Sequence, residues 1–159
     1  MRVGIGYDIH RFRADGDGHL RLGGIEIPDA PCLDGHSDGD ALIHAIIDAL
    51  LGAAGEGDIG KHFPPGDPST KGIDSRELLK RVHRLISARG YEVNNLDATV
   101  VAERPRLSGY IEKMRESIAI VLGVDLSAVS VKATTNEGMG EVGAGQAISV
   151  TAVALIEES

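Results

Sequence analysis

Two histidines and an aspartate near the start of the chain have the spacing of metal ligands. Asp8 and His10 end the segment 1–10, which predicts a β-strand, so both side chains point to the same side of that strand. His44 lies in the first turns of residues 40–53, which are apolar almost all round and predict a buried helix. A buried neutral imidazole is a good metal ligand, and three protein ligands leave the fourth tetrahedral position of a zinc ion open. If the strand and the helix meet in space, Asp8, His10 and His44 form a zinc site of the catalytic type.

The residues around His44 allow two interpretations of the segment 36–44. In the first, Asp48 lies one helical turn beyond His44 and orients the second ring nitrogen of this ligand. In the second, the segment is only a helix N-terminus with two structural histidines. The spacing alone does not decide between them. A hydrolase site is not indicated, because the adjacent residues His36 and Ser37 rarely form a productive hydrogen bond and no oxyanion motif accompanies them.

The composition restricts the class of protein. A chain of 159 residues with 42% hydrophobic residues can form a real core, so we expect a single domain over residues 1–159. The net charge of −8, the 3% aromatic residues and the absence of Trp argue against nucleic-acid binding, which favours basic faces and stacking rings. No segment approaches the ~20 apolar residues of a membrane span. The single cysteine, Cys32, and the lack of a targeting segment before the first strand predict a cytoplasmic location without disulfides.

Further periodic segments alternate between strand and helix character. Strands are expected where polar and apolar residues alternate or where a segment is continuously apolar, and helices where apolar residues recur with the helical period. The expected strands are residues 20–27 (or two short strands broken at the glycines), 94–103, 129–135 and 147–156, and the expected helices are 74–89 and 108–122. Two segments are expected to be irregular, 55–68 and the glycine-rich 136–146. The almost wholly apolar segment 147–156 is typical of a central strand.

These segments predict an α/β (α+β) two-layer sandwich. With the first strand and helix included, about five strands and three helices give a mixed four- to five-stranded sheet that the helices cover on one face. Residues 100–101 and 150–156 are apolar on both sides of their strands. Because no helices are left for the second face of the sheet, we expect that face to pack against another copy of the chain.

Five separated motifs resemble one family, the 2-C-methyl-D-erythritol 2,4-cyclodiphosphate synthases of the non-mevalonate isoprenoid pathway. The motifs are Asp8-Ile9-His10, His36-Ser37-Asp38-Gly39-Asp40, Asp58-Ile59-Gly60-Lys61, Lys71-Gly72-Ile73-Asp74-Ser75 and Lys132-Ala133-Thr134-Thr135-Asn136-Glu137. They follow the order of the family, and the resemblance covers nearly the whole chain. Five coinciding motifs make the resemblance far more specific than any one of them.

The resemblance implies a phosphorus–oxygen lyase that forms a homotrimer, with its sheets facing the threefold axis and active sites between adjacent subunits. The implied substrate is 4-diphosphocytidyl-2-C-methyl-D-erythritol 2-phosphate. Its 2-phosphate attacks the β-phosphorus, CMP leaves, and 2-C-methyl-D-erythritol 2,4-cyclodiphosphate forms. Because nucleophile and electrophile belong to one molecule, motifs without an activated protein nucleophile suit this reaction. The implied partners are this small molecule and further copies of the chain, not a nucleic acid or a membrane.

The resemblance also implies roles for individual residues. The implied Zn²⁺ ligands are Asp8, His10 and His44. Glu137 is implied to hold a second divalent ion, Mg²⁺ or Mn²⁺, on the diphosphate, while His36 and Thr135 contact phosphate oxygens as charge develops. Asp58 and Gly60 are implied to bind the ribose. The full set of implied substrate contacts is Asp8, His10, His36, Ser37, Asp58, Ile59, Gly60, Phe63, Asp67, Ala102, Pro105, Arg106, Leu107, Thr134, Thr135, Asn136 and Glu137.

The resemblance implies that His36, Ser37 and residues 63–67 surround the methylerythritol part of the substrate, and that residues 102–108 form the cytosine pocket. Two positions depart from the family pattern. The loop 63–67 has Pro65 where the family usually has an aspartate, so a carboxylate and an N–H are missing there. Further on, Ala144 stands where the family often has an arginine, which weakens the expectation of an isoprenoid diphosphate in the central cavity of the trimer.

Two other functions are compatible with the same residues. A zinc-dependent phosphohydrolase acting on a nucleotide diphosphate would share the metal ligands but would need a positioned water molecule. A catalytically silent nucleotide-binding trimer would need none of the metal motif, yet Asp8, His10, His44 and Glu137 are all present. The metal motif therefore favours an enzyme.

Overall fold

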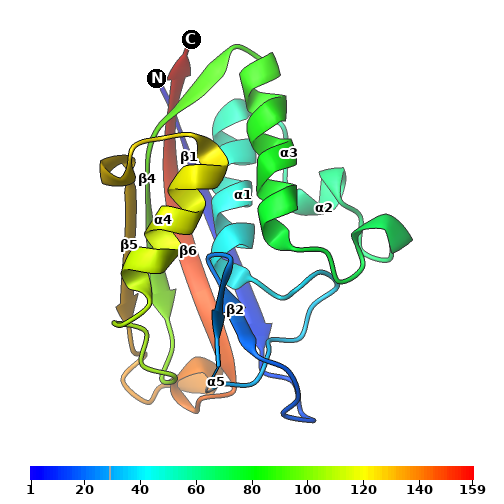
Figure 1. The fold of residues 1–159 in the computed structure, drawn as a ribbon, viewed down its shortest axis with the longest axis vertical. Coiled ribbons are helices and arrows are strands. Elements are labelled where there is room, and N and C mark those ends of the chain that lie inside the picture. The colour runs from blue at the N-terminus through cyan, green and yellow to red at the C-terminus, as the bar shows by residue number, and fades with distance from the viewer. Residues whose placement is uncertain (29) are drawn as a thin grey trace.

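The computed structural model describes residues 1–28 and 30–159, which form a layer of helices on a β-sheet (Figure 1). The strands are β1 (Arg2–Arg11), β2 (Leu20–Leu22), β3 (Ile25–Ile27), β4 (Tyr91–Val101), β5 (Val129–Thr134) and β6 (Ala147–Glu158). The α-helices are α1 (Ala41–Ala54), α2 (Ile59–His62), α3 (Ser75–Ala88), α4 (Ile111–Leu122) and α5 (Gly140–Gly143). Short 3₁₀ turns cover Pro68–Thr70 (η1) and Leu126–Ala128 (η2).

The main sheet contains four strands in the order β1-β6-β4-β5. β6 pairs antiparallel with β1 and β4, while β4 and β5 are parallel, so the sheet is mixed as predicted. β6 lies between two neighbours, which confirms the prediction of a central strand for this apolar segment. Residues 20–27 do not join the main sheet. They form the separate β2–β3 hairpin, because Gly23 and Gly24, with φ of 63° and 75°, turn the chain between two short strands.

Helices α1, α3 and α4 cover one face of the main sheet, which confirms the predicted α/β class (Figure 1). α1 lies directly on β1 and β6, α3 packs against α1, and α4 packs against β5. α1 covers Ala41–Ala54 where residues 40–53 were predicted, and it ends before Gly55, which has a φ of 75°. The short helices α2 and α5 occur in segments predicted to be irregular, since a single helical turn is too short to show a periodic pattern.

A buried carboxylate joins the start of α1 to the β2–β3 hairpin. The Asp40 side chain accepts hydrogen bonds from the backbone N of Gly23, Gly24 and Ile43, at 2.9, 2.7 and 3.0 Å. Burial raises the pKa of this carboxyl, and these N–H groups partly offset the shift. Asp40 therefore caps the helix that carries His44 and fixes its position relative to the hairpin.

β1 has glycines on the side that faces α1. A Cβ atom at Gly6 would lie 1.9 Å from the carbonyl oxygen of Ala45, and one at Gly4 would lie 2.0 Å from that of Ala49. No side chain can be placed between the two elements, so the helix lies against the strand backbone itself. The two candidate ligands of β1 follow the glycines on the same side of the strand.

The other side of β1 carries apolar side chains that are exposed in the single chain. The exposed fractions are 68% for Val3, 70% for Ile5, 58% for Tyr7 and 45% for Ile9, and Val153 on the paired strand β6 is 40% exposed. The three long helices lie on the opposite face, so these residues form an uncovered apolar surface of the sheet. Within the part of the chain that the structure describes, the helices are too short or too polar to cross a membrane.

Candidate active site

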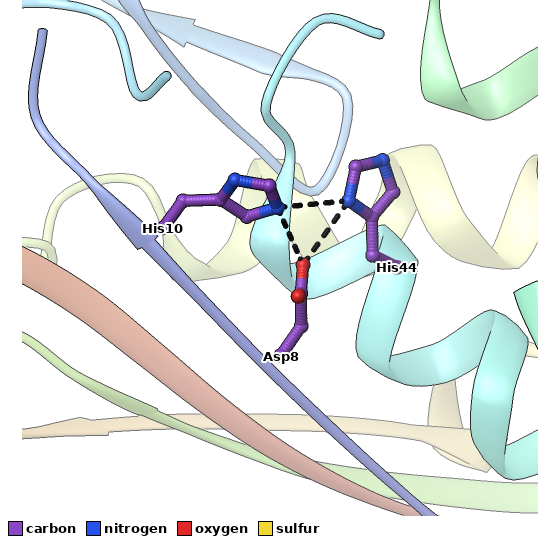
Figure 2. A group of neighbouring side chains, drawn as sticks. All are labelled: Asp8, His10 and His44. Carbon is purple, nitrogen blue, oxygen red and sulfur yellow. Dashed lines mark hydrogen bonds and ion pairs between the residues drawn. The ribbon is translucent and has the colours of Figure 1, made fainter. Parts of the chain in front are cut away.

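The end of β1 and the first turns of α1 bring Asp8, His10 and His44 together, as Figure 2 shows. Oδ2 of Asp8 lies 2.8 Å from Nε2 of His10 and 3.1 Å from Nδ1 of His44, and these two nitrogens are 3.3 Å apart. Two nitrogen ligands of a tetrahedral zinc ion, each 2.0–2.1 Å from the metal, lie about 3.3 Å from one another. The three donor atoms are therefore spaced to share one ion, and the predicted meeting of strand and helix is confirmed.

Hydrogen bonds and neighbouring charges set the protonation of the two candidate ligands on β1. Nδ1 of His10 lies 2.5 Å from the carbonyl oxygen of Asp34, which can only accept, so Nδ1 carries the proton and the lone pair of Nε2 faces the site. Burial lowers the pKa of His10, but hydrogen bonds and charge from Asp8 and Asp34 together bring it above its ordinary value. Burial likewise raises the pKa of Asp8, but before a metal ion binds, hydrogen bonds and charge from the two histidine rings bring it well below its ordinary range. A bound metal ion would replace the ring protons that make these hydrogen bonds. The Asp8 carboxyl is thus in the charged form that metal binding requires.

The predicted partner of His44 is wrong. Oδ1 of Asp48 accepts a hydrogen bond from the backbone N of Ile59 at 2.7 Å, and so anchors the start of α2 instead. Nε2 of His44 lies 2.9 Å from Oγ of Ser37 and 2.9 Å from Oγ of Ser75. Ser75 is the first residue of α3, so helical periodicity along α1 could not reveal this contact. In the sequence, only the family motif 71–75, which contains Ser75, indicated that this residue could belong to the site.

A pocket of about 200 Å³ opens beside the three candidate ligands. It is lined by Asp8, His10, His36, Ser37, His44, Ile59, Gly60, Phe63, Pro65, Thr70 and Leu78. Nε2 of His36 lies 3.0 Å from the carbonyl oxygen of Asp67 and 3.3 Å from Oγ1 of Thr70, which fixes the ring at the pocket wall. The structure therefore gathers most of the predicted contacts from the first half of the chain around the metal triad.

Two of the predicted contacts stabilise the loops beside this pocket. Oδ1 of Asp58 accepts from the backbone N of Lys61 at 2.9 Å and caps α2. Oδ1 of Asp67 accepts from the backbone N of Ser69 at 2.9 Å and caps η1, and this hydrogen bond lowers the pKa of Asp67. Pro65 lines the pocket, so this position, where the resemblance led us to expect a carboxylate, offers hydrocarbon.

The predicted contacts from the second half of the chain form a separate pocket of about 450 Å³ at the ends of β4 and β5. It is lined by Ala102, Glu103, Pro105, Arg106, Leu107, Ser108, Ile111, Ala133, Thr134 and Thr135. β1 and β5 are the two edges of the sheet, about 14 Å apart at three strand spacings. Within one chain, the two pockets therefore lie beside opposite edges of the sheet.

Glu137 lies in the turn that follows β5, and Glu103 holds this turn. Oε1 of Glu103 accepts from the backbone N of Asn136 at 2.8 Å and from that of Gly138 at 3.3 Å. Glu137 itself has a φ of 53°, which residues other than glycine seldom adopt, so a constrained turn presents its carboxylate. The resemblance placed Glu103 only within the cytosine segment 102–108, and its contact with this turn was missed because nothing in the sequence shows that the residue lies beside the turn after β5.

The comparisons with known proteins agree with this geometry. The sequence model of the YgbB family matches residues 1–157. The chain belongs to the YgbB family. Relatives of this YgbB chain that are named 2-C-methyl-D-erythritol 2,4-cyclodiphosphate synthase include one from Pseudomonas putida, 56% identical over 156 residues, and one from Alkaliphilus oremlandii, 54% identical over 156 residues. Each alignment covers 98% of this chain and 98% of the relative, which confirms the resemblance seen in the motifs.

Solved structures share the fold of this YgbB chain. A structure described as the Plasmodium falciparum IspF CDP complex has a TM-score of 0.86 at 36% identity, covering 99% of this chain and 96% of the other. A 2C-methyl-D-erythritol-2,4-cyclodiphosphate synthase in a CDP-bound form has a TM-score of 0.89 at 33% identity, covering 98% and 100%. The bifunctional IspDF from Campylobacter jejuni has a TM-score of 0.95 at 37% identity, and the YgbB chain corresponds to 42% of that longer protein.

Proposed function

We propose that the chain converts 4-diphosphocytidyl-2-C-methyl-D-erythritol 2-phosphate into 2-C-methyl-D-erythritol 2,4-cyclodiphosphate and CMP. The observation that carries this proposal is the convergence of Asp8, His10 and His44 on one point beside a pocket. Relatives with the name of this synthase, more than half identical over nearly the full length, support the substrate. Solved relatives described as CDP complexes support a cytidine diphosphate ligand.

The donor set fits a metal ion and the substrate calls for one. The chain has a net charge of −8, so an anionic substrate needs positive charge supplied locally. Zn²⁺ on Asp8, His10 and His44, with Mg²⁺ or Mn²⁺ on Glu137, would neutralise phosphate oxygens and so favour attack by one phosphate on another. One carboxylate and two imidazoles suit zinc, while a lone carboxylate beside a diphosphate suits the harder magnesium or manganese ion.

The proposed reaction is an internal phosphoryl transfer. An oxygen of the 2-phosphate forms a bond to the β-phosphorus. The bond from this phosphorus to the oxygen that bridges to the α-phosphate breaks, and CMP leaves with the electron pair. The protein has to hold both ends of one flexible molecule in line, which removes much of the entropic part of the barrier. We assign contacts with the phosphate oxygens to His36 and Thr135.

The remaining contacts divide between the two pockets. We assign the ribose to Asp58 and Gly60 at α2, and the methylerythritol part to the neighbouring wall. We assign the cytosine to the second pocket. The proposed contacts beside the metal triad are Ser37, Ile59, Phe63 and Asp67, and those of the second pocket and its adjoining turn are Ala102, Pro105, Arg106, Leu107, Thr134 and Asn136.

Replacing Asp48 by Ala should raise the KM for this substrate about tenfold with little change in zinc affinity. The change removes the 2.7 Å hydrogen bond that holds Ile59 and α2, and a hydrogen bond to a charged group is worth about 1.5–3 kcal/mol. Kinetics and zinc titration on the same preparation measure both quantities. Asp125→Ala, at an exposed aspartate outside both pockets, is the matched control. A parallel loss of zinc affinity would instead restore Asp48 as the residue that orients His44.

We further propose that three copies of the chain assemble through the uncovered face of the sheet. The apolar side chains on this face of β1 and β6 are the kind of continuous exposed patch that marks an interface. Assembly would also bring the two kinds of pocket together, because the β1 edge of one copy can meet the β5 edge of the next. A complete active site then takes its zinc ligands from one subunit and its cytosine pocket from the neighbour.

Ile5→Asp should dissociate the trimer and abolish turnover while zinc binding remains. Ile5 is 70% exposed on the apolar face, where a carboxylate would be buried by assembly, whereas the zinc ligands all belong to a single chain. Sedimentation should show the mass of one chain instead of three. Ile120→Asp is the matched control, since Ile120 is 80% exposed on α4 at the other layer of the molecule. A variant Ile5→Asp that sediments as the trimer would exclude this face as the interface.

The activity itself is tested by the product formed from the cytidine substrate in ¹⁸O-labelled water. Cyclisation yields CMP and a cyclic diphosphate without solvent oxygen, because the attacking oxygen comes from the substrate. A zinc phosphohydrolase would give a linear product that contains ¹⁸O. A protein that binds the substrate but releases no CMP would be a silent nucleotide-binding trimer. Either of the last two results would refute the proposed function.

A further inference from the structure

We infer that Asp38 and Ser75 form a hydrogen-bonded relay that fixes the ring of His44 with its proton on Nε2 and its lone pair on Nδ1. The inference rests on the proposed zinc site and deepens it, by assigning positioning roles to two residues outside the predicted ligand and substrate sets. It starts from Oγ of Ser75, which lies 2.9 Å from Nε2 of His44 and 2.5 Å from Oδ1 of Asp38.

The direction of the relay is set at Asp38. Oδ1 of Asp38 accepts a hydrogen bond from the backbone N of Asp40 at 3.1 Å, and Oδ2 accepts one from the backbone N of Ser75 at 2.9 Å. With an N–H donor on each oxygen, this side chain acts as an acceptor on both sides. The Ser75 hydroxyl at 2.5 Å from Oδ1 must therefore donate its proton to Asp38.

The state of the His44 ring follows from this assignment. A serine hydroxyl has one proton, so once Ser75 donates to Asp38 its oxygen can only accept from the imidazole. Nε2 of His44 must then carry the ring proton. A neutral imidazole has only one N–H, so Nδ1, 3.1 Å from Oδ2 of Asp8, presents a lone pair to the proposed ion. Ser75 is fully buried and His44 is 8% exposed, so bulk water competes little for these bonds.

The relay also assigns a direction to Ser37. Oγ of Ser37 lies 2.9 Å from the same Nε2, which is a donor in this arrangement, so the Ser37 oxygen accepts a share of that N–H. The Ser37 hydroxyl proton then takes no part in the hydrogen bond with His44, and it can be donated to a ligand in the pocket that Ser37 lines. It is a donor of the kind that an anionic phosphate oxygen or a substrate hydroxyl would accept.

An asparagine at position 38 could not accept the same hydrogen bonds as the Asp38 carboxylate. In Asp38→Asn, the NH₂ group would meet the backbone N–H of Asp40 if placed at Oδ1, or that of Ser75 if placed at Oδ2. Placed at Oδ1, the NH₂ group would also donate to the Ser75 hydroxyl, whose proton would then turn toward Nε2. That turn would move the ring proton to Nδ1 and block the metal-binding atom.

Zinc affinity of the full-length chain, measured by competition with a chromophoric chelator, tests the relay. Ser75→Ala keeps the backbone N–H bond to Asp38 but removes the hydroxyl, and should weaken zinc binding about tenfold, at the lower end of the range for partners of metal ligands. Asp38→Asn should weaken it by about 10–100-fold. Ser75→Thr retains the hydroxyl and should restore most of the affinity. The control is Ser117→Ala, because the buried Oγ of Ser117 has no hydrogen-bond partner among the described residues.

The ring nitrogens give a second readout. In long-range ¹H–¹⁵N spectra of the zinc-loaded wild-type chain, the His44 ring proton should appear on Nε2 and exchange slowly with water, and Ser75→Ala should accelerate this exchange. A His44 ring proton that exchanges as fast in the wild-type chain as in Ser75→Ala, or affinities of Ser75→Ala and Asp38→Asn equal to that of Ser117→Ala, would overturn the relay while leaving the zinc site in place. Absence of zinc binding by the wild-type chain would overturn both the relay and the metal site of the proposed function.

Discussion

His44→Ala is expected to lower the rate of cyclisation by about a thousandfold or more. Nδ1 of His44 lies 3.1 Å from Oδ2 of Asp8 and 3.3 Å from Nε2 of His10, so its removal leaves two of the three ligands. A bound metal is worth several kcal/mol of transition-state stabilisation on phosphoryl oxygens, and each 1.36 kcal/mol is about tenfold in rate. Single-turnover kinetics measure the rate, and chelator competition should show that zinc affinity falls with it.

A histidine outside the site provides the control for this experiment. His19 is exposed and its Nδ1 lies 3.1 Å from the carbonyl oxygen of Pro28, so His19→Ala removes a ring without touching either pocket. It should retain wild-type rate and zinc affinity. Because His44 is nearly buried, the melting temperature of His44→Ala must be recorded as well, and a single cooperative transition is expected. Cyclisation by a folded His44→Ala chain within tenfold of the wild-type rate would show that the ligand assignment is wrong.

The metal triad could be predicted from the sequence because local rules determine each of its parts. The twofold alternation of a strand places Asp8 and His10 on one side, and the apolar run after residue 40 requires a buried helix with His44 near its start. Only the meeting of the two elements is a tertiary fact. The resemblance to a family supplied that fact indirectly, since the motifs that contain these residues occur together in it.

The partners that hold these ligands could not be predicted in the same way. Nε2 of His44 contacts Ser75 on α3, and Nδ1 of His10 contacts the carbonyl oxygen of Asp34 in a loop. Both contacts depend on how separate elements pack, and the second uses a backbone atom that any residue would offer. The local rule instead selected Asp48, one turn along the helix, and its carboxylate is used by Ile59. Helical spacing identifies neighbours along one helix, but most of α1 is buried, so its side chains also meet residues of other elements.

The two sides of β1 carry different kinds of residue, although the strand as a whole is apolar. Val3, Ile5, Tyr7 and Ile9 all lie on the uncovered face, while the intervening positions are glycines and then the two candidate ligands. A strand with side chains on one side and glycines on the other is suited to lie directly under a helix. The glycines bring the backbones of β1 and α1 together, and the ligands follow where the helix begins.

Gly6→Ala is therefore expected to destabilise the fold and the metal site together. Its Cβ would lie 1.9 Å from the carbonyl oxygen of Ala45 and 2.7 Å from the backbone N of Ala49, and both atoms belong to the helix backbone. No side-chain rotation can relieve such contacts, so α1 and β1 must separate. Overpacking of this kind costs about 1–3 kcal/mol or more, which for a chain of this size lowers the melting temperature by about 2–4 °C per kcal/mol.

The effect on zinc distinguishes this variant from an ordinary core mutation. Asp8 and His10 move with β1 while His44 moves with α1, so separating the two elements stretches a triad whose donor atoms now lie 2.8–3.3 Å apart. Zinc affinity should fall at least about tenfold even at temperatures where the chain is fully folded. Gly109→Ala is the matched control, since no atom lies within 4 Å of the added Cβ, and it should change neither quantity. If Gly6→Ala binds zinc as tightly as Gly109→Ala, the close approach of strand and helix does not set the geometry of the site.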